Sequence, residues 1–186
     1  MIEDQKISNI DFRGQALEDE YNNCTFINCN FSEMQIKEVV FEDCKFELCN
    51  FSLAKMDAFW RDVQFKECKL TGANFTKINP FSTFSFEQSN LQYAIFVKTK
   101  LKNTKFITCN LQEADFTQTD LTMAQFNNCD LQRTIFSNTN LEKADLTTSH
   151  NYIIDPNNNT IRKARFSKYG LSGLLLSFGI IIEDVD

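Results

Sequence analysis

The chain has 186 residues, which suits one domain with a single core, and its five Gly and two Pro exclude a linker-rich protein. No apolar run approaches the ~20 residues of a membrane-spanning helix. The first residues lack the basic and apolar regions of a secretory signal, so we expect a cytoplasmic protein with no membrane contact. The net charge of −6 argues against direct nucleic-acid binding.

Large apolar residues recur at intervals of five from the start of the chain. The spacing is four residues instead of five before Tyr21 and again before Trp60. The members of the series are Ile7, Phe12, Leu17, Tyr21, Phe26, Phe31, Ile36, Phe41, Phe46, Phe51, Met56, Trp60, Phe65, Leu70 and Phe75. We expect all of these side chains to point into one core.

The segment around Pro80 interrupts this series. The stretch "KINPFSTF" contains one extra residue, so the spacing from Phe75 to the next inner position is six. We therefore expect Phe81 and Phe86 to occupy the next inner positions. Pro80 cannot donate a backbone hydrogen bond, which favours a bulge or loop. Phe84 stands where a small residue stands elsewhere. We therefore expect a distorted coil over residues 76–86.

From Phe86 to Leu146 every fifth residue is Phe or Leu, and after Phe86 a small residue stands two places before each one. A period of five fits neither a helix nor a strand. A five-residue unit is too short to bury its own apolar residue, so it must stack on copies of itself. The pattern predicts that the large and the small residue point inward and the other three face water.

All seven Cys fall two residues before a large inner residue, at Cys24, Cys29, Cys44, Cys49, Cys68, Cys109 and Cys129. They occupy the places that Ala, Ser and Thr fill in other units. A soft-metal site is the alternative, but inward thiols in a stacked core have no open coordination geometry. We therefore expect reduced core residues and no bound metal.

The period fails from His150 onward, so we expect two parts, a repeat domain over 1–149 and a capping and dimerisation segment over 150–186. Residues 155–159 form a turn cluster. Ser172 to Phe178 has helical spacing, Gly179 is placed to end that helix, and Ile180 to Ile182 are typical of a short strand.

The apolar residues of this segment exceed what one rod end needs for a cover. An exposed patch of that size is a liability on a monomer, and a two-fold interface would bury it. We therefore expect a homodimer joined through Leu171, Leu174, Leu175, Leu176, Phe178, Ile180, Ile181 and Ile182.

No catalytic constellation is present in the sequence. His150 is the only His, and the sequence places no base, acid or nucleophile beside it. The glycines form no phosphate-binding loop. We expect a protein that is not an enzyme, with no catalytic residue and no cofactor.

The stretches "EADFTQTDLTMAQF" and "EKADL" resemble the A(D/N)LXX motif of the pentapeptide-repeat family. The resemblance implies an all-β solenoid, a right-handed quadrilateral β-helix with four units per coil. The inner positions from Ile7 to Leu146 then make about seven coils. Rotation by one side per unit places Cys29, Cys49, Cys68, Ser89, Cys109 and Cys129 on one side. After residue 86 it places Phe and Leu on alternating walls.

The C-terminal stretch "NYIIDPNNNTIRKARF", followed by "LLLSFGIIIED", is similar to one class within this family. This class gives immunity to peptide antibiotics, as the albicidin and microcin resistance proteins do, and quinolone-resistance proteins are more distant relatives. Such proteins imitate a DNA duplex, act on DNA gyrase and dimerise through the C-terminal segment. The resemblance implies gyrase binding through outward acids such as Asp115, Asp120 and Asp130.

The charge pattern keeps a second hypothesis open. Residues 68–105 hold six Lys, including Lys98, Lys100, Lys102 and Lys105, against the single acid Glu87, with acidic segments on both sides. A duplex mimic should show a longer negative stripe. The alternative is a generic scaffold or protein-interaction module with no topoisomerase link. On the surface of the dimer, a continuous negative strip favours the mimic, and alternating patches favour the scaffold.

Overall fold

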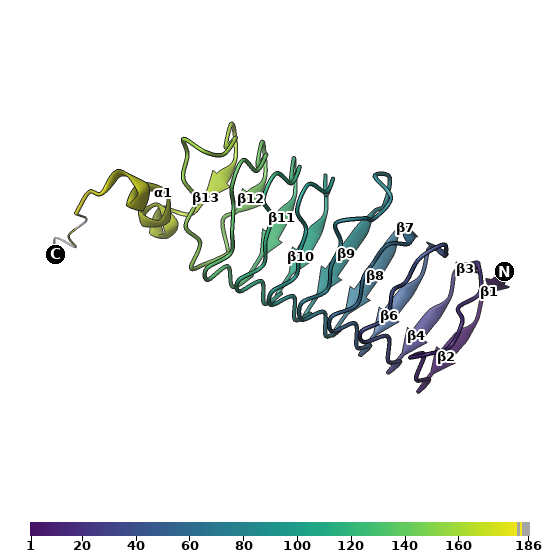
Figure 1. The fold of residues 1–186 in the computed structure, drawn as a ribbon. Coiled ribbons are helices and arrows are strands. Elements are labelled where there is room, and N and C mark those ends of the chain that lie inside the picture. The colour runs from purple at the N-terminus through teal and green to yellow at the C-terminus, as the bar shows by residue number, and fades with distance from the viewer. Residues whose placement is uncertain (182, 184–186) are drawn as a thin grey trace.

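Five-residue units form the four sides of a flat coil, and about eight such turns stack in parallel into a rod with a short helix at its C-terminal end (Figure 1). The computed structural model describes residues 1–181 and residue 183. The prediction of an all-β solenoid is confirmed.

Two sides of the coil are sheets with parallel pairing throughout. Face A begins with a four-stranded sheet of β1 (Ile2–Glu3), β3 (Glu20–Asn22), β5 (Val40–Glu42) and β7 (Phe59–Arg61). Face B is a nine-stranded sheet of β2 (Lys6–Ser8), β4 (Thr25–Ile27), β6 (Lys45–Glu47), β8 (Val63–Lys66), β9 (Phe84–Glu87), β10 (Lys105–Ile107), β11 (Gln125–Asn127), β12 (Asp145–Leu146) and β13 (Arg165–Phe166).

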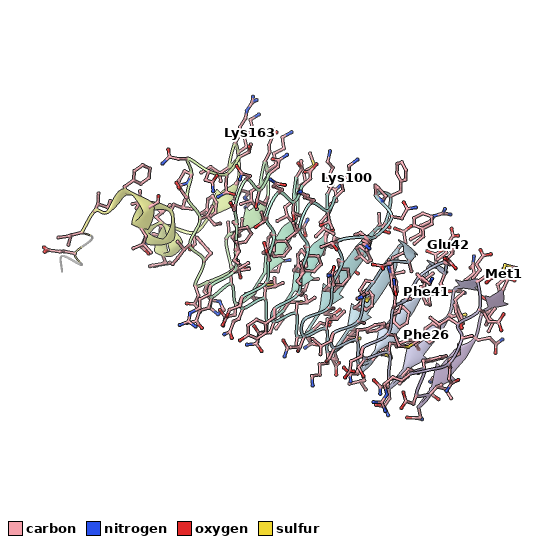
Figure 2. All side chains as sticks on the ribbon, viewed as in Figure 1. Met1, Phe26, Phe41, Glu42, Lys100 and Lys163 are labelled. Atoms are coloured by element: carbon pink, nitrogen blue, oxygen red, sulfur yellow. The ribbon has the colours of Figure 1, made fainter. Side chains whose placement is uncertain are left out.

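The other two sides are held by single bridges between coils. Face C runs through Asp11, Asn30, Asn50, Lys69, Asn90, Asn110, Asp130 and His150, and face D through Gln35, Lys55, Asn74, Ile95, Asp115 and Ile135. Face A continues in the same form through Lys100, Asp120, Asn140 and Thr160. Labelled side chains show the division, since Phe26 and Phe41 lie inside the coil and Glu42, Lys100 and Lys163 outside (Figure 2).

The polar residues of the repeat shape its corners. An Asn or Asp one place before the inner residue accepts the backbone N–H two places on, as Asn50 does from Ser52 at 3.0 Å. This Asx turn explains the D/N of the motif. The corner residue two places after the inner one takes a positive φ, 61° at Lys98. Its N–H donates to the next coil, from Lys98 to the Thr117 carbonyl at 2.9 Å, which offsets the strain.

The thiol ladder lies on one side of the rod, as predicted. The Cys29 N–H donates to Cys49 Sγ at 3.4 Å, and that thiol donates to the Phe26 carbonyl at 3.4 Å. Ser89 continues the ladder, because its hydroxyl accepts the Cys68 N–H at 3.0 Å. All seven thiols are free and buried. Burial raises the pKa of Cys44 to about 11, and the neighbouring thiol of Cys68 together with burial raises the pKa of Cys49.

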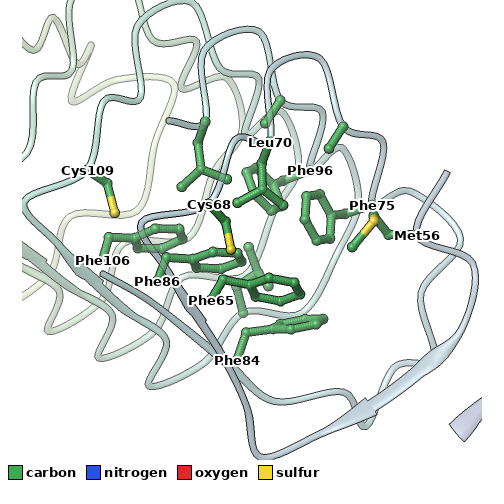
Figure 3. Close-up of a cluster of buried hydrophobic side chains, with 14 of the residues drawn as sticks. Met56, Phe65, Cys68, Leu70, Phe75, Phe84, Phe86, Phe96, Phe106 and Cys109 are labelled. Carbon is green, nitrogen blue, oxygen red and sulfur yellow. The ribbon is translucent and has the colours of Figure 1, made fainter. Parts of the chain in front are cut away.

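Phe stacks line opposite walls beyond residue 86, which confirms the alternating arrangement. On face B the rings of Phe86 and Phe106 are stacked with centroids 5.2 Å apart (Figure 3). On face D the centroids of Phe96 and Phe116 are 4.9 Å apart. Leucines fill faces A and C in the same coils. Each buried ring contributes roughly 1.5–3 kcal/mol through apolar burial.

Phe81 is not an inner residue, contrary to the prediction. Its side chain is 80% exposed on a loop over residues 79–83, the Pro80 loop. Pro80 has no N–H for the face A ladder, so the extra residue bulges outward. Phe84 turns inward instead and lies beside Phe65 and Phe75, with ring centroids 6.3 and 5.9 Å away (Figure 3). The Trp60 ring lies 6.3 Å from that of Phe84. Phe84 therefore fills the space that an inner residue of face A would occupy.

The solenoid is about one turn longer than the predicted seven. It begins already at Ile2 in β1, and at the other end β13 pairs with β12, so that Phe166 lies opposite Leu146. Between them Tyr152 and Ile154 are buried in the core. These residues break the Phe/Leu period, which is why the sequence pattern ended too early.

The C-terminal segment contains η1 (Lys168–Gly170), α1 (Ser172–Leu175) and η2 (Leu176–Phe178), and Gly179 ends it with a φ of 65°. The predicted helix over Ser172 to Phe178 is therefore present, with its second half as a 3-10 turn. The expected strand is absent at Ile180 and Ile181, which have no neighbouring strand to pair with, and Ile182 lies outside the described residues. Across the described part of the chain, no helix has the length and apolarity to cross a bilayer.

We expect Phe116→Asp to unfold the middle coils and Gln118→Asp to leave them intact. The Phe116 ring is fully buried, and a carboxylate there would have no partner, at a cost of several kcal/mol. Gln118 is exposed at a corner with a φ of 57°, which Asp tolerates. Thermal unfolding followed by circular dichroism compares the two variants. Equal losses of stability would show that the five-residue phase is wrong.

Candidate interaction surfaces

The three acids predicted to bind a partner lie on three different sides of the rod. Asp115 belongs to face D, Asp120 to face A and Asp130 to face C. The structure therefore does not bring them together into one site. Any single flat partner surface would reach only one of them.

Each of these carboxylates also has a local structural role. Asp115 accepts the Thr117 N–H at 2.8 Å, and Asp120 accepts the Thr122 hydroxyl at 2.6 Å and lies 3.3 Å from Lys102 Nζ. Partial burial raises the pKa of Asp120, but the hydrogen bonds from Thr122 and Lys102 outweigh it, so the pKa lies below its usual value. The same balance lowers the pKa of Asp130. Corner formation alone accounts for acids at these positions.

The charges along face A alternate rather than forming one strip. Acids gather near the N-terminal end, at Glu3, Asp4, Glu20, Glu42, Asp43 and Asp62. Lys100 and Lys102 follow, and Arg162 and Lys163 lie toward the other end. The labelled Glu42, Lys100 and Lys163 mark these three zones along one edge of the rod (Figure 2). By the criterion set from the sequence, this pattern is the one expected of a scaffold.

An apolar patch covers the outer side of the C-terminal segment. Leu174 is buried against the end of the solenoid, but the other described residues of the predicted interface are exposed, with Phe178 at 53% and Ile181 at 87%. They are Leu171, Leu175, Leu176, Phe178, Ile180 and Ile181. Ile182, the remaining predicted residue, lies outside the described part of the chain.

Two glycines let this segment dock closely on the last coil. The Ile154 N–H donates to the Gly173 carbonyl at 3.0 Å. A Cβ on Gly173 would collide with the backbone oxygen of Tyr152, and one on Gly170 with the Tyr152 hydroxyl. These contacts lie outside the predicted sites, and their one signal in the sequence is the spacing of the two glycines in "YGLSG".

A hollow of about 600 Å³ lies between the last coil and the C-terminal helix. Its lining includes Arg133, His150, Tyr152 and Tyr169. His150 Nε2 lies 4.0 Å from Asp130 Oδ1. Within residues 1–181 and 183, no group of three His, Cys, Asp or Glu side chains is arranged to hold a metal ion.

Comparison with known proteins identifies the repeat. A family model described as a pentapeptide repeat region matches residues 18–96 and 58–134. Among curated proteins, no sequence matches the chain significantly. The fold resembles a trypsin-treated variant of QnrB1, a plasmid-mediated fluoroquinolone resistance protein, with a TM-score of 0.65 and 20% identity over 98% of this chain and 97% of that one.

Full-length QnrB1 gives a TM-score of 0.54 at 20% identity, over 96% of this chain and 100% of that one. A second trypsin-treated variant gives 0.59 at 22% identity, over 98% and 91%. At this identity the likeness establishes the fold alone. Because the family model covers more than half of the chain, and the coil has the four-sided form that the motif implies, the protein belongs to the pentapeptide-repeat family.

Proposed function

We propose that this protein acts in the cytoplasm as a homodimer that binds DNA gyrase and protects it from an antibiotic or toxin without catalysing a reaction. The observation that supports this most is the similarity of fold, over nearly the whole length of both chains, to QnrB1, a fluoroquinolone resistance protein. Membership of the peptide-antibiotic immunity class stays a prediction from the C-terminal sequence.

In this proposal the repeat domain predicted over 1–149, extended by the last coil to Phe166, forms the binding rod, and the rest of segment 150–186 dimerises. The exposed apolar side chains of α1, η2 and the residues that follow would be covered by the same patch of a second copy. About eight turns at ~4.8 Å make a rod of roughly 38 Å, so two rods joined end to end approach ~77 Å. That length fits a groove that binds a DNA duplex.

The alternating charges of face A favour a second candidate, a scaffold with no topoisomerase link. The carboxylates near the N-terminal end are separated from Asp120 by Lys100 and Lys102. A duplex carries uniform negative charge along its length. Even the N-terminal zone of face A is not uniformly negative, because Arg61 pairs with Glu42 at 2.7 Å.

We expect Phe178→Glu to weaken the dimer by at least about tenfold, because a charge in each copy would be buried across the two-fold interface. Gly173→Ala should weaken it too by displacing α1 from Tyr152. Ser172→Ala, at an exposed position in the same helix, serves as the control. Sedimentation equilibrium gives the association constants. A monomer at micromolar concentration for the unchanged chain would contradict the proposed assembly.

In a supercoiling assay, we expect the purified protein to restore the activity of gyrase inhibited by a fluoroquinolone or by a gyrase-directed peptide antibiotic. Phe178→Glu should lose this protection, since a single rod is half as long as the dimer. A response of gyrase that is unchanged at large excess of a protein shown to be dimeric would remove the gyrase proposal and leave the scaffold.

A further inference from the structure

The Pro80 loop presents Phe81 to solvent in an ordered setting. Asn79 Oδ1 accepts the Phe81 N–H at 2.9 Å, and the Asn79 carbonyl accepts the Ser82 N–H at 2.9 Å. The Thr83 N–H donates to the Trp60 carbonyl at 2.7 Å, and the Ser82 hydroxyl accepts the Trp60 N–H at 3.2 Å. An aromatic ring that is 80% exposed on a hydrogen-bonded loop loses little conformational entropy on binding.

Lysines gather around this loop, and we call Lys77, Lys98, Lys100, Lys102 and Lys105 the basic belt. The pairing of Asn74 with Ile95 places Lys77 and Lys98 on adjacent coils, at the corner between faces D and A. Lys100 follows on face A, beside the loop (Figure 2). Among the described residues only Lys102 of the belt forms an ion pair, with Asp120. Four ammonium groups are thus left for a partner.

A groove of about 330 Å³ runs along the other side of the loop, at the corner between faces A and B. Lys102 and Lys105 line one wall, and Asp62 and Thr83 the opposite one. The groove exists because the hydrogen bonds of the loop run toward the coil of Trp60. Lys100 bridges only to Asp120, on the side away from the loop, within the described structure. In the described structure, face A therefore has no backbone bridge between the Pro80 loop and the coil of Lys100.

We propose that the Pro80 loop and the basic belt form a docking surface for a short acidic protein segment that carries an apolar side chain. Phe81 packs against that apolar side chain, and Lys77, Lys98, Lys100 and Lys105, the belt lysines outside the Lys102–Asp120 ion pair, bind the carboxylates. This binding is independent of the proposed action on gyrase, which uses the acidic surface of the rod.

The surrounding charges limit the partner to a short segment. The belt covers two coils, about 10 Å, and an extended peptide advances ~3.3 Å per residue. With the reach of the lysine side chains, about four to six residues fit. A longer polyanion such as a nucleic acid would also lie against Asp43 and Asp62, the acids of face A beyond the loop. Repulsion there disfavours it, most strongly at low salt, where screening is weakest.

The proposal is tested with a fluorescein-labelled peptide of Asp and Glu around one central Leu, titrated by anisotropy at low salt. We expect Lys100→Glu to weaken binding by about tenfold or more. Lys45→Glu makes the same charge change at the equivalent place in a unit of face B, and it should alter binding less than about twofold. Phe81→Ser should weaken binding by about tenfold, while an unchanged melting temperature shows that the exposed loop still folds.

A second peptide, with Ser in place of Leu, separates the two contributions. It should bind more weakly to the unchanged protein and be insensitive to Phe81→Ser. Equal effects of Lys45→Glu and Lys100→Glu would mean that only net charge matters and would overturn the proposal. So would tighter binding of a short oligothymidine than of the Leu peptide, or no binding of that peptide at millimolar concentration.

Discussion

The backbone ladder between coils is the interaction on which the rest of the structure depends. It fixes the spacing of successive turns at about 4.8 Å, so each side chain stacks directly on its counterpart one turn away. The ring centroids of Phe106 and Phe126 are 4.9 Å apart and nearly parallel, which is the spacing imposed by the ladder. From Phe86 to Leu141, the inner residues of faces B and D are Phe and those of faces A and C are Leu, so each side chain stacks on one of its own kind.

The ladder also explains the polar part of the repeat. Coil corners leave backbone groups that no strand satisfies, and short side chains bridge them. Cys49 and Ser89 do so with a thiol and a hydroxyl at equivalent places, and Asn50 with an Asx turn. The seven cysteines therefore need no metal or disulfide to explain their positions. They act as small hydrogen-bonding core residues.

The surface features of interest arise where the ladder is interrupted. The extra residue at Pro80 releases Phe81 to solvent, draws Phe84 into the core and leaves the groove beside Lys102. At the C-terminal end, Gly170 and Gly173 replace coil stacking by close packing on Tyr152, and the apolar face of the helix is left outward. Regular coils supply a rigid rod, and the two interruptions supply surfaces suited to binding.

The period of five was enough to predict the solenoid, the direction of nearly every side chain and the sorting of Phe and Leu onto opposite walls. It did not decide where the extra residue of "KINPFSTF" goes, because Phe81 and Phe84 are equally large and only packing against Trp60 and Phe75 distinguishes them. Rotation by one side per unit already implied that Asp115, Asp120 and Asp130 lie on different faces. The docking of Gly173 on Tyr152 depends on a backbone contact that no residue pattern records.

Hydrogen exchange of the backbone amides tests the ladder most directly. If the ladder holds the fold together, the amides of Leu101, Phe116 and Leu121 exchange only when the whole rod unfolds. The Ser82 amide and those of α1, which lie outside the ladder, exchange much faster through local opening. Exchange at Leu121 as fast as at Ser82 would contradict this account, because the coils would then open independently of one another.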